Sequence, residues 1–118
     1  MDARQSYSEL LRRVRETALL QSCAGVLAWD ERTCMPRQGA AHRGAQMGLL
    51  ARLAHEMATS PAVGERLAAV EASDLVKDPE SDAAANVREI RRTYDRATKL
   101  PADLVEELAK VTSQAQQA

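Results

Sequence analysis

The sequence contains no phenylalanine, few aromatic residues of any kind (3%) and little glycine or proline. Strands are enriched in aromatic and β-branched residues, so this shortage argues against a β-sheet. Alanine and leucine, which favour helices, are abundant instead. The composition therefore predicts an all-α protein, and 118 residues suit one domain with a modest core.

An excess of positive charge is also missing, because 16 basic and 17 acidic residues give a net charge of −1. This balance argues against general binding of nucleic acids, which usually requires a basic surplus. No run approaches the roughly 18 apolar residues of a membrane span, and the charged N-terminus lacks the apolar core of a signal peptide. We therefore expect neither a nucleic acid nor a membrane as partner, and a cytoplasmic location.

Cysteine is scarce, with only Cys23 and Cys34 present. If both lie on one helix, they are about 16 Å apart along its axis, whereas a disulfide needs Cα atoms within about 7 Å. An internal bridge is therefore not expected. Two reduced thiols fit a cytosolic protein.

Histidine is equally scarce, with only His42 and His55. His55-Glu56 begins the zinc-peptidase motif HExxH, in which two histidines four residues apart hold one zinc ion and the glutamate acts as base. Thr59 occupies the position of the second histidine, and His42 is 13 positions away from His55. A site of both histidines and one acid is conceivable, but the spacing does not favour it. We expect no catalytic and no metal-binding residue in this chain.

Apolar residues recur every three to four positions along most of the chain, which is the pattern of amphipathic helices. The pattern predicts about five helices in a hairpin-like or bundle-like array with a long first helix. Their starts are set by capping residues and prolines. The expected helices run from Ser6 or Ser8 to just before Pro36, from about Gly39 to Ala58, from Ser60-Pro61 through Val70, from Asp78-Pro79 to Lys99, and onward from Pro101.

Capping signals support three of these starts. Ser6 and Glu9 have the spacing of a capping box, and Ser60 precedes a proline at the first helical position. Asp78 stands in the same relation to Pro79. The polar segment 71–82 between the third and fourth helices is expected to be an exposed loop.

The middle of the first helix, residues 19–29, is apolar on nearly every side. A helix that is hydrophobic all round is normally buried all round. Four short neighbouring helices cannot cover this surface, so we expect the isolated chain to self-associate. On the fifth helix, the residues expected to face inward are Leu104, Leu108, Val111 and Ala115.

A cluster of arginines lies on one side of the fourth helix and could contact phosphates. Acidic neighbours and the absence of interleaved aromatic residues favour a solvated helix face instead. The cluster consists of Arg88, Arg91, Arg92 and Arg96.

The last residues, TSQAQQA at 112–118, contain none of the glycine, proline or basic residues that usually close a helix. We therefore expect this helix to continue in a longer parent protein.

One long stretch resembles a known family. AWDERTCMPRQGAAHRGAQMGLLARLAHE, residues 28–56, is similar to the N-terminal signature of the carboxypeptidase Taq family of zinc metallocarboxypeptidases. The resemblance continues through residues 82–116 and covers essentially the whole chain. The family often places paired glycines after Met-Pro, whereas Gln38 precedes Gly39 here. The matching signature residues are Trp29, Asp30, Thr33, Met35, Pro36, Gly39, Arg43 and Leu53-Ala54-His55-Glu56.

The resemblance implies an all-helical parent several times longer, which removes C-terminal amino acids from peptides with the aid of zinc and tends to dimerise. Residues 1–118 would form one N-terminal helical domain that covers the active-site cleft like a lid. The zinc-binding helix and the glutamate ligand would follow later, so the chain alone is expected to be inactive and without cofactor. The alternative is a non-enzymatic helical module that binds a protein partner.

We interpret the signature residues as structural, because proline and glycine typically define a turn. Trp29 is expected to anchor the core, with its indole N–H satisfied by a polar group. Asp30 is expected either to accept hydrogen bonds from the turn at residues 33–35 or to pair with Arg32 or Arg43.

Overall fold

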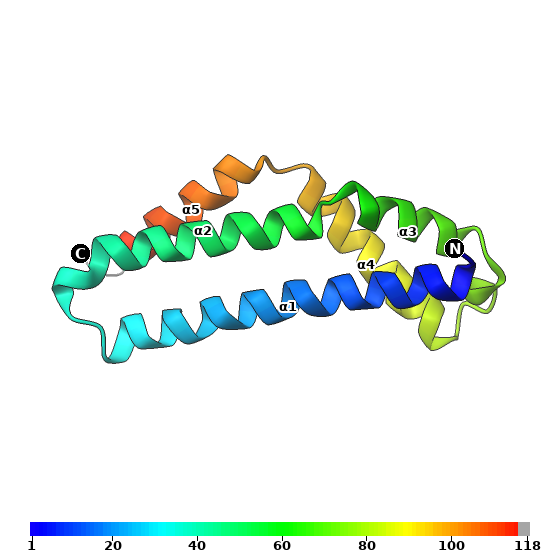
Figure 1. The fold of residues 1–118 in the computed structure, drawn as a ribbon, viewed down its shortest axis with the longest axis horizontal. Coiled ribbons are helices and arrows are strands. Elements are labelled where there is room, and N and C mark those ends of the chain that lie inside the picture. Colours follow the sequence, from blue (N-terminus) through cyan, green and yellow to red (C-terminus); the bar gives the residue numbers. More distant parts are fainter. Residues whose placement is uncertain (116–118) are drawn as a thin grey trace. The chain divides into compact units, whose positions relative to one another are not determined.

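The computed structural model describes residues 1–115. These residues form five α-helices and two short 3-10 helices without any strand, which confirms the predicted all-α class and the long first helix (Figure 1). The elements are α1 (Ala3–Thr33), η1 (Arg37–Gly39), α2 (Ala40–Ala58), α3 (Pro61–Glu71), η2 (Asp74–Val76), α4 (Asp82–Thr98) and α5 (Ala102–Ala115).

The helices form two compact units. Unit 1 contains residues 1–16 and 57–99, and unit 2 contains residues 17–56 together with the chain from Leu100 onward. Helix α1 therefore contributes its first part to unit 1 and its second part to unit 2. That residues 1–118 form a single domain stays a prediction.

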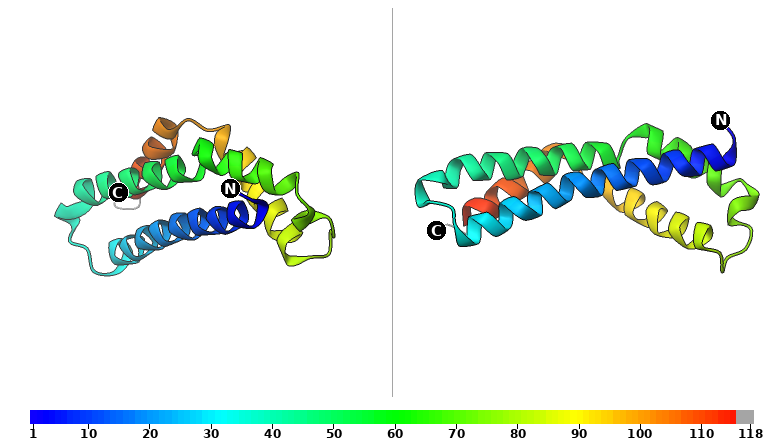
Figure 2. Two further views of the ribbon diagram at one scale, coloured as in Figure 1. Left: turned by 45° about the vertical axis from the view of Figure 1, so that its right-hand side comes forward. Right: turned by 60° about the horizontal axis from the view of Figure 1, so that its bottom comes forward.

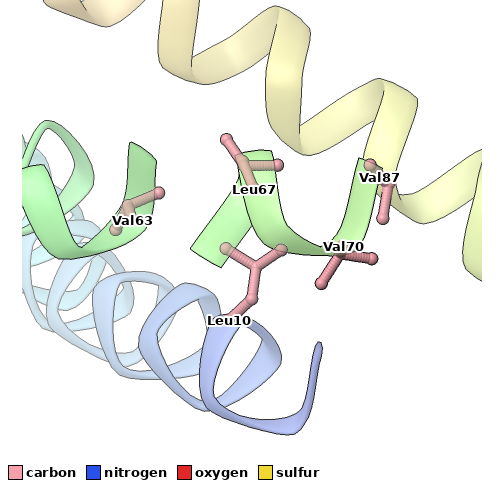
Figure 3. Close-up of a cluster of buried hydrophobic side chains, with 5 residues drawn as sticks. All are labelled: Leu10, Val63, Leu67, Val70 and Val87. Atoms are coloured by element: carbon pink, nitrogen blue, oxygen red, sulfur yellow. The ribbon is translucent and has the colours of Figure 1, made fainter. Parts of the chain in front are cut away.

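Unit 1 has a small aliphatic core. Leu10 of α1 lies among valine and leucine side chains of α3 and α4 (Figure 3), and Leu67 and Val70 are also fully buried. Each such side chain stabilises the fold by about 1.5–3 kcal/mol through removal of apolar surface from water. The core consists of Leu10, Val63, Leu67, Val70 and Val87, and Tyr7, Leu75, Val76, Ile90 and Tyr94 pack against it.

The segment expected to be an exposed loop is therefore only partly so. Leu75 and Val76 lie in η2 and cover the core of unit 1. Ser73 caps this short helix by accepting a hydrogen bond from the N–H of Leu75. Because most residues of the segment 71–82 are polar, the sequence pattern did not reveal that Leu75 and Val76 pack against the core.

The start of α1 differs from the prediction. Asp2 and Gln5 form a reciprocal capping pair, in which the N–H of Gln5 donates to Asp2 Oδ1 (2.8 Å) and the N–H of Asp2 donates to Gln5 Oε1 (2.9 Å). Ser6, expected to cap the helix together with Glu9, is instead a buried residue inside α1. The capping box exists, but it lies four residues earlier in the sequence.

The predicted cap of α3 is confirmed, because Ser60 Oγ accepts a hydrogen bond from the N–H of Ala62. The predicted start of α4 was wrong by several residues. Ser81 is the cap, accepting from the N–H of Ala84, while Asp78 Oδ1 accepts from the N–H of Glu80 in a turn before the helix.

Three of the four arginines in the cluster on α4, Arg88, Arg91 and Arg92, are engaged by neighbouring groups in unit 1. Arg91 donates to both carboxylate oxygens of Glu71 on α3 (2.6 and 3.1 Å), and this contact, with the pair to Asp95, raises the pKa of Arg91 above its usual value. Arg92 pairs with Glu89 on the same helix. This pattern fits the predicted solvated face with acidic neighbours.

Unit 2 contains the second part of α1, nearly all of α2, and α5. The second part of α1 and α2 run antiparallel and are joined by a short turn, and α5 runs antiparallel to α2 (Figures 1 and 2). Two glycines of α2 permit close approach of α5. A Cβ atom on Gly48 would lie 3.1 Å from the carbonyl oxygen of Glu106, and one on Gly44 would lie 3.0 Å from Gln114 Cγ.

The apolar face of α5 was predicted to point inward, and this prediction was wrong. Leu104, Leu108 and Val111 are 44%, 56% and 50% exposed, and Ala115 is exposed as well. Helix α5 instead buries Ser113, whose hydroxyl donates to Glu31 of α1 (2.5 Å). How the helix ends beyond Ala115 lies outside the described residues.

No helix within residues 1–115 combines the length and the hydropathy needed to cross a bilayer. Both thiols, Cys23 and Cys34, are free and exposed.

Candidate functional site

The signature residues from Trp29 to Arg43 lie at and beside the turn between α1 and α2, whereas Leu53-Ala54-His55-Glu56 lie near the other end of α2. Helix α1 ends at Thr33, and the N–H groups of Cys34 and Met35 both donate to the carbonyl oxygen of Asp30 (2.8 and 2.9 Å). This pair of hydrogen bonds satisfies a carbonyl that the helix end would otherwise leave without a partner. The start of the turn is therefore stabilised by backbone hydrogen bonds.

Pro36 and Gly39 complete the reversal. Pro36 is extended (φ −64°, ψ 147°) and its ring prevents continuation of α1, while the N–H of Gly39 donates to the Pro36 carbonyl (2.9 Å). No glycine in the described part of the chain has a positive φ. The single glycine at this turn, in place of the paired glycines of the family pattern, thus requires no left-handed conformation.

Arg43 ties α2 to the end of α1. Its Nη2 donates to Asp30 Oδ2 (2.9 Å), its Nη1 donates to the carbonyl oxygen of Leu27 (2.8 Å), and its Nε donates to Gln46 (3.0 Å). The Arg43 side chain is only 14% exposed. Of the partners expected for the Asp30 carboxylate, Arg43 is the one with which it forms an ion pair.

Trp29 is not the core anchor that the sequence predicted. Its side chain is 60% exposed, and Leu19 and Val26 on the same apolar section of α1 are each 67% exposed. Helices α2 and α5 cover only part of that section. The exposure of Leu19 and Val26 agrees with the expectation that the neighbouring helices cannot cover this section, whereas the expectation that Trp29 anchors the core was wrong.

An apolar groove lies between the two long helices of unit 2. It has a volume of about 520 Å³. We call it the α1–α2 groove, and its lining residues are Cys23, Val26 and Leu27 from α1 and Gln46, Leu49 and Leu50 from α2.

The two histidines do not fit a zinc site. Both lie on α2, His42 is exposed, and His55 Nε2 donates to the carbonyl oxygen of Leu100 (2.7 Å). Within residues 1–115 no three histidine, cysteine or acidic side chains are grouped so that they could hold a metal ion. His55-Glu56 is thus part of a helix end that contacts the start of α5, and we derive no metal-dependent step from these residues.

The sequence reasoning missed one buried polar pair, Glu31 and Ser113. A small cavity of about 260 Å³ beside them is also lined by Met47 and Leu108. Acidic side chains are rarely fully buried, so nothing in the sequence marked Glu31. The only available signal was that Thr112-Ser113 belongs to the stretch of family resemblance.

This geometry defines an all-helical scaffold segment, in which the signature builds a turn and the described residues offer no metal centre. The family model for the carboxypeptidase Taq (M32) metallopeptidases matches residues 9–118. Thermostable carboxypeptidase 1 of Thermus thermophilus is 49% identical over 116 residues.

The chain belongs to the carboxypeptidase Taq (M32) metallopeptidase family. The alignment with the Thermus relative covers 98% of this chain but 23% of the relative. The chain therefore spans less than a quarter of the length of that protein.

Proposed function

We propose that this chain forms the N-terminal helical part of a zinc-dependent metallocarboxypeptidase that removes C-terminal amino acids from peptides. The observation that carries the proposal is the family match over residues 9–118, together with 49% identity to a carboxypeptidase along 98% of the chain. The 23% coverage of that relative supports a role as one segment of a larger enzyme.

Within such an enzyme we expect this segment to flank the active-site cleft and to shield it from water. Helices that flank a cleft exclude water and restrict access to extended peptide ends. The residues described here supply hydrogen bonds, ion pairs and apolar surface, but no set of metal ligands. The zinc ion and the groups that activate water would come from the rest of the enzyme, so the isolated chain is inactive.

Three observations test the proposal. The purified chain, supplied with zinc and an N-blocked dipeptide, is expected to release no C-terminal amino acid, and zinc-dependent release would contradict this. A hybrid in which the chain replaces the matching segment of the Thermus carboxypeptidase is expected to keep zinc-dependent release. The DNA that follows the codon of Ala118 is expected to continue into a region encoding HExxH.

A second candidate is a non-enzymatic helical module, which the exposed apolar residues Leu19, Val26 and Trp29 favour. Surfaces of this kind commonly associate with another protein surface. We expect the isolated chain to self-associate through them, as light scattering at rising concentration would show. A stop codon directly after Ala118 would favour this candidate over the enzyme segment.

A further inference from the structure

We infer that the α1–α2 groove is the docking site for an apolar helix from the remainder of the metallopeptidase polypeptide. The inference rests on the proposed function for the identity of the occupant. Its location rests on the geometry of unit 2 alone.

The shape and chemistry of the groove fit a helix with aliphatic side chains. Val26 and Leu27 line one wall, and Leu49 and Leu50 line the other. A groove between two helices commonly receives the apolar face of a third, through side chains spaced three to four residues apart. Among residues 1–115 no charged side chain lines the groove, so this part of the chain offers no ionic partner to a phosphate or a peptide terminus there.

The one polar amide in the groove is already engaged. Gln46 Oε1 accepts a hydrogen bond from Arg43 Nε (3.0 Å). That contact holds the amide oxygen toward the turn between α1 and α2 and occupies one of its two lone pairs. Burial of this surface is therefore driven mainly by removal of apolar area from water.

An apolar ridge continues the docking surface along α1. Leu19, Val26 and Trp29 are separated by seven and three residues, so they share one side of the helix. All three are at least 60% exposed. Trp side chains at such positions are often the ones that carry most of the binding energy of an interface.

The length of the relative supports this choice of occupant. About three quarters of the Thermus carboxypeptidase lies outside the match, so a large amount of polypeptide would be joined covalently to a segment like this one. A covalently joined helix acts at an effective concentration near the millimolar range, whereas a second copy must bind from dilute solution. The tethered helix therefore outcompetes self-association for the same groove.

The two free cysteines allow a direct test. Cys23 lines the groove, whereas Cys34 follows the end of α1 and does not. Maleimide labelling of each thiol is compared by mass spectrometry between the dilute isolated chain and the Thermus hybrid described above. Labelling of Cys23 is expected to be at least about tenfold slower in the hybrid. This corresponds to a free energy of opening the groove of at least roughly 1.4 kcal/mol.

Equal reactivity of Cys23 in the two proteins would overturn the inference. Protection that appears in the isolated chain as its concentration rises, and does not increase in the hybrid, would assign the groove to a second copy instead. The peptidase activity of the hybrid separates the two proposals. An active hybrid with a reactive Cys23 contradicts only the docking site, whereas a folded but inactive hybrid contradicts the proposed function.

Two matched variants of the hybrid give an independent measurement. Leu49, in the groove, and Leu100, outside it, are 43% and 44% exposed in the chain. Leu49→Lys is expected to lower the melting temperature of the hybrid and to restore labelling of Cys23, whereas Leu100→Lys leaves both nearly unchanged. In the isolated chain the two variants are expected to melt alike, because the two leucines are exposed to nearly the same extent. Equal effects in the hybrid would contradict the docking site.

Discussion

Arg43 and Asp30 lie thirteen residues apart in the sequence and 2.9 Å apart in the fold. The same guanidinium donates to the carbonyl oxygen of Leu27, so one side chain of α2 holds two positions of α1. The ion pair is partly shielded, since the Arg43 side chain is 14% exposed and that of Asp30 is 38% exposed. A side chain of α2 thus holds together the turn that carries the family signature.

The first prediction concerns this contact. Replacement of Arg43 with methionine keeps the aliphatic stem but removes the charged donors, and is expected to lower the free energy of unfolding by about 1–2 kcal/mol. Arg37→Met, at an exposed arginine of η1, is the control and is expected to change it by less than about 0.5 kcal/mol. Urea denaturation followed by circular dichroism measures both. Equal effects would show that the contact does not stabilise the fold.

The second prediction compares two helical glycines. Gly25→Ala places a methyl group that meets no atom within 4 Å beyond its chain neighbours and its own helix backbone, so it is expected to stabilise the chain by up to about 1 kcal/mol through higher helix propensity. Gly48→Ala gains the same propensity but sets its Cβ 3.1 Å from a backbone carbonyl of α5, which overpacks the contact. It is expected to be destabilising overall. Stabilisation by both variants, measured by thermal unfolding, would mean that α5 moves away freely.

The third prediction concerns the core of unit 1. Leu67 is fully buried among Leu10, Val63 and Val87, so Leu67→Ala leaves a cavity and is expected to destabilise by about 2–4 kcal/mol. Val14→Ala, at a residue that is 37% exposed, is expected to cost under about 1 kcal/mol. Chemical denaturation of the two variants gives the comparison. A loss below about 1 kcal/mol for Leu67→Ala would contradict the assigned core.

The fourth prediction concerns pH. The hydrogen bond from Arg12, with the neighbouring charge of Arg13, lowers the pKa of Glu9 from 4.5 to about 2. Because the pKa is lower in the folded state, the stabilisation by this carboxylate is complete above about pH 4.5 and is lost as the pH falls toward 2. Arg12→Gln is expected to move the carboxyl carbon titration of Glu9, measured by NMR, back toward 4.5. An unchanged midpoint would assign the shift to another group.

The predictions from sequence were most successful where the cause is local. Ser60 caps α3 and Pro61 is its first residue, so the signal lies within one helical turn. The structure confirms this predicted helix start. The capping box of α1 was placed wrongly because Asp2-x-x-Gln5 and Ser6-x-x-Glu9 carry nearly the same pattern. Burial of Ser6 within unit 1 decides between them, and burial depends on contacts that the pattern does not contain.

The predictions failed where a face needs a distant partner. The spacing of Leu104, Leu108 and Val111 shows that α5 has an apolar side, but it does not show which element covers that side. The same holds for Trp29 on α1. In both cases the chain was assumed to bury its own apolar surface. The buried Glu31 escaped notice for the opposite reason, because its hydrogen-bond partner lies far along the chain on α5.

The division of the helices between the two units sets an order of events on the ribosome. Every residue of unit 1 has been synthesised once Lys99 is added, whereas α5, which lies over Gly44 and Gly48 of unit 2, is synthesised later. During translation the first unit can therefore fold while α2 still displays its two glycines to solvent. In this nascent chain, the packing of α2 is completed only after α5 has emerged.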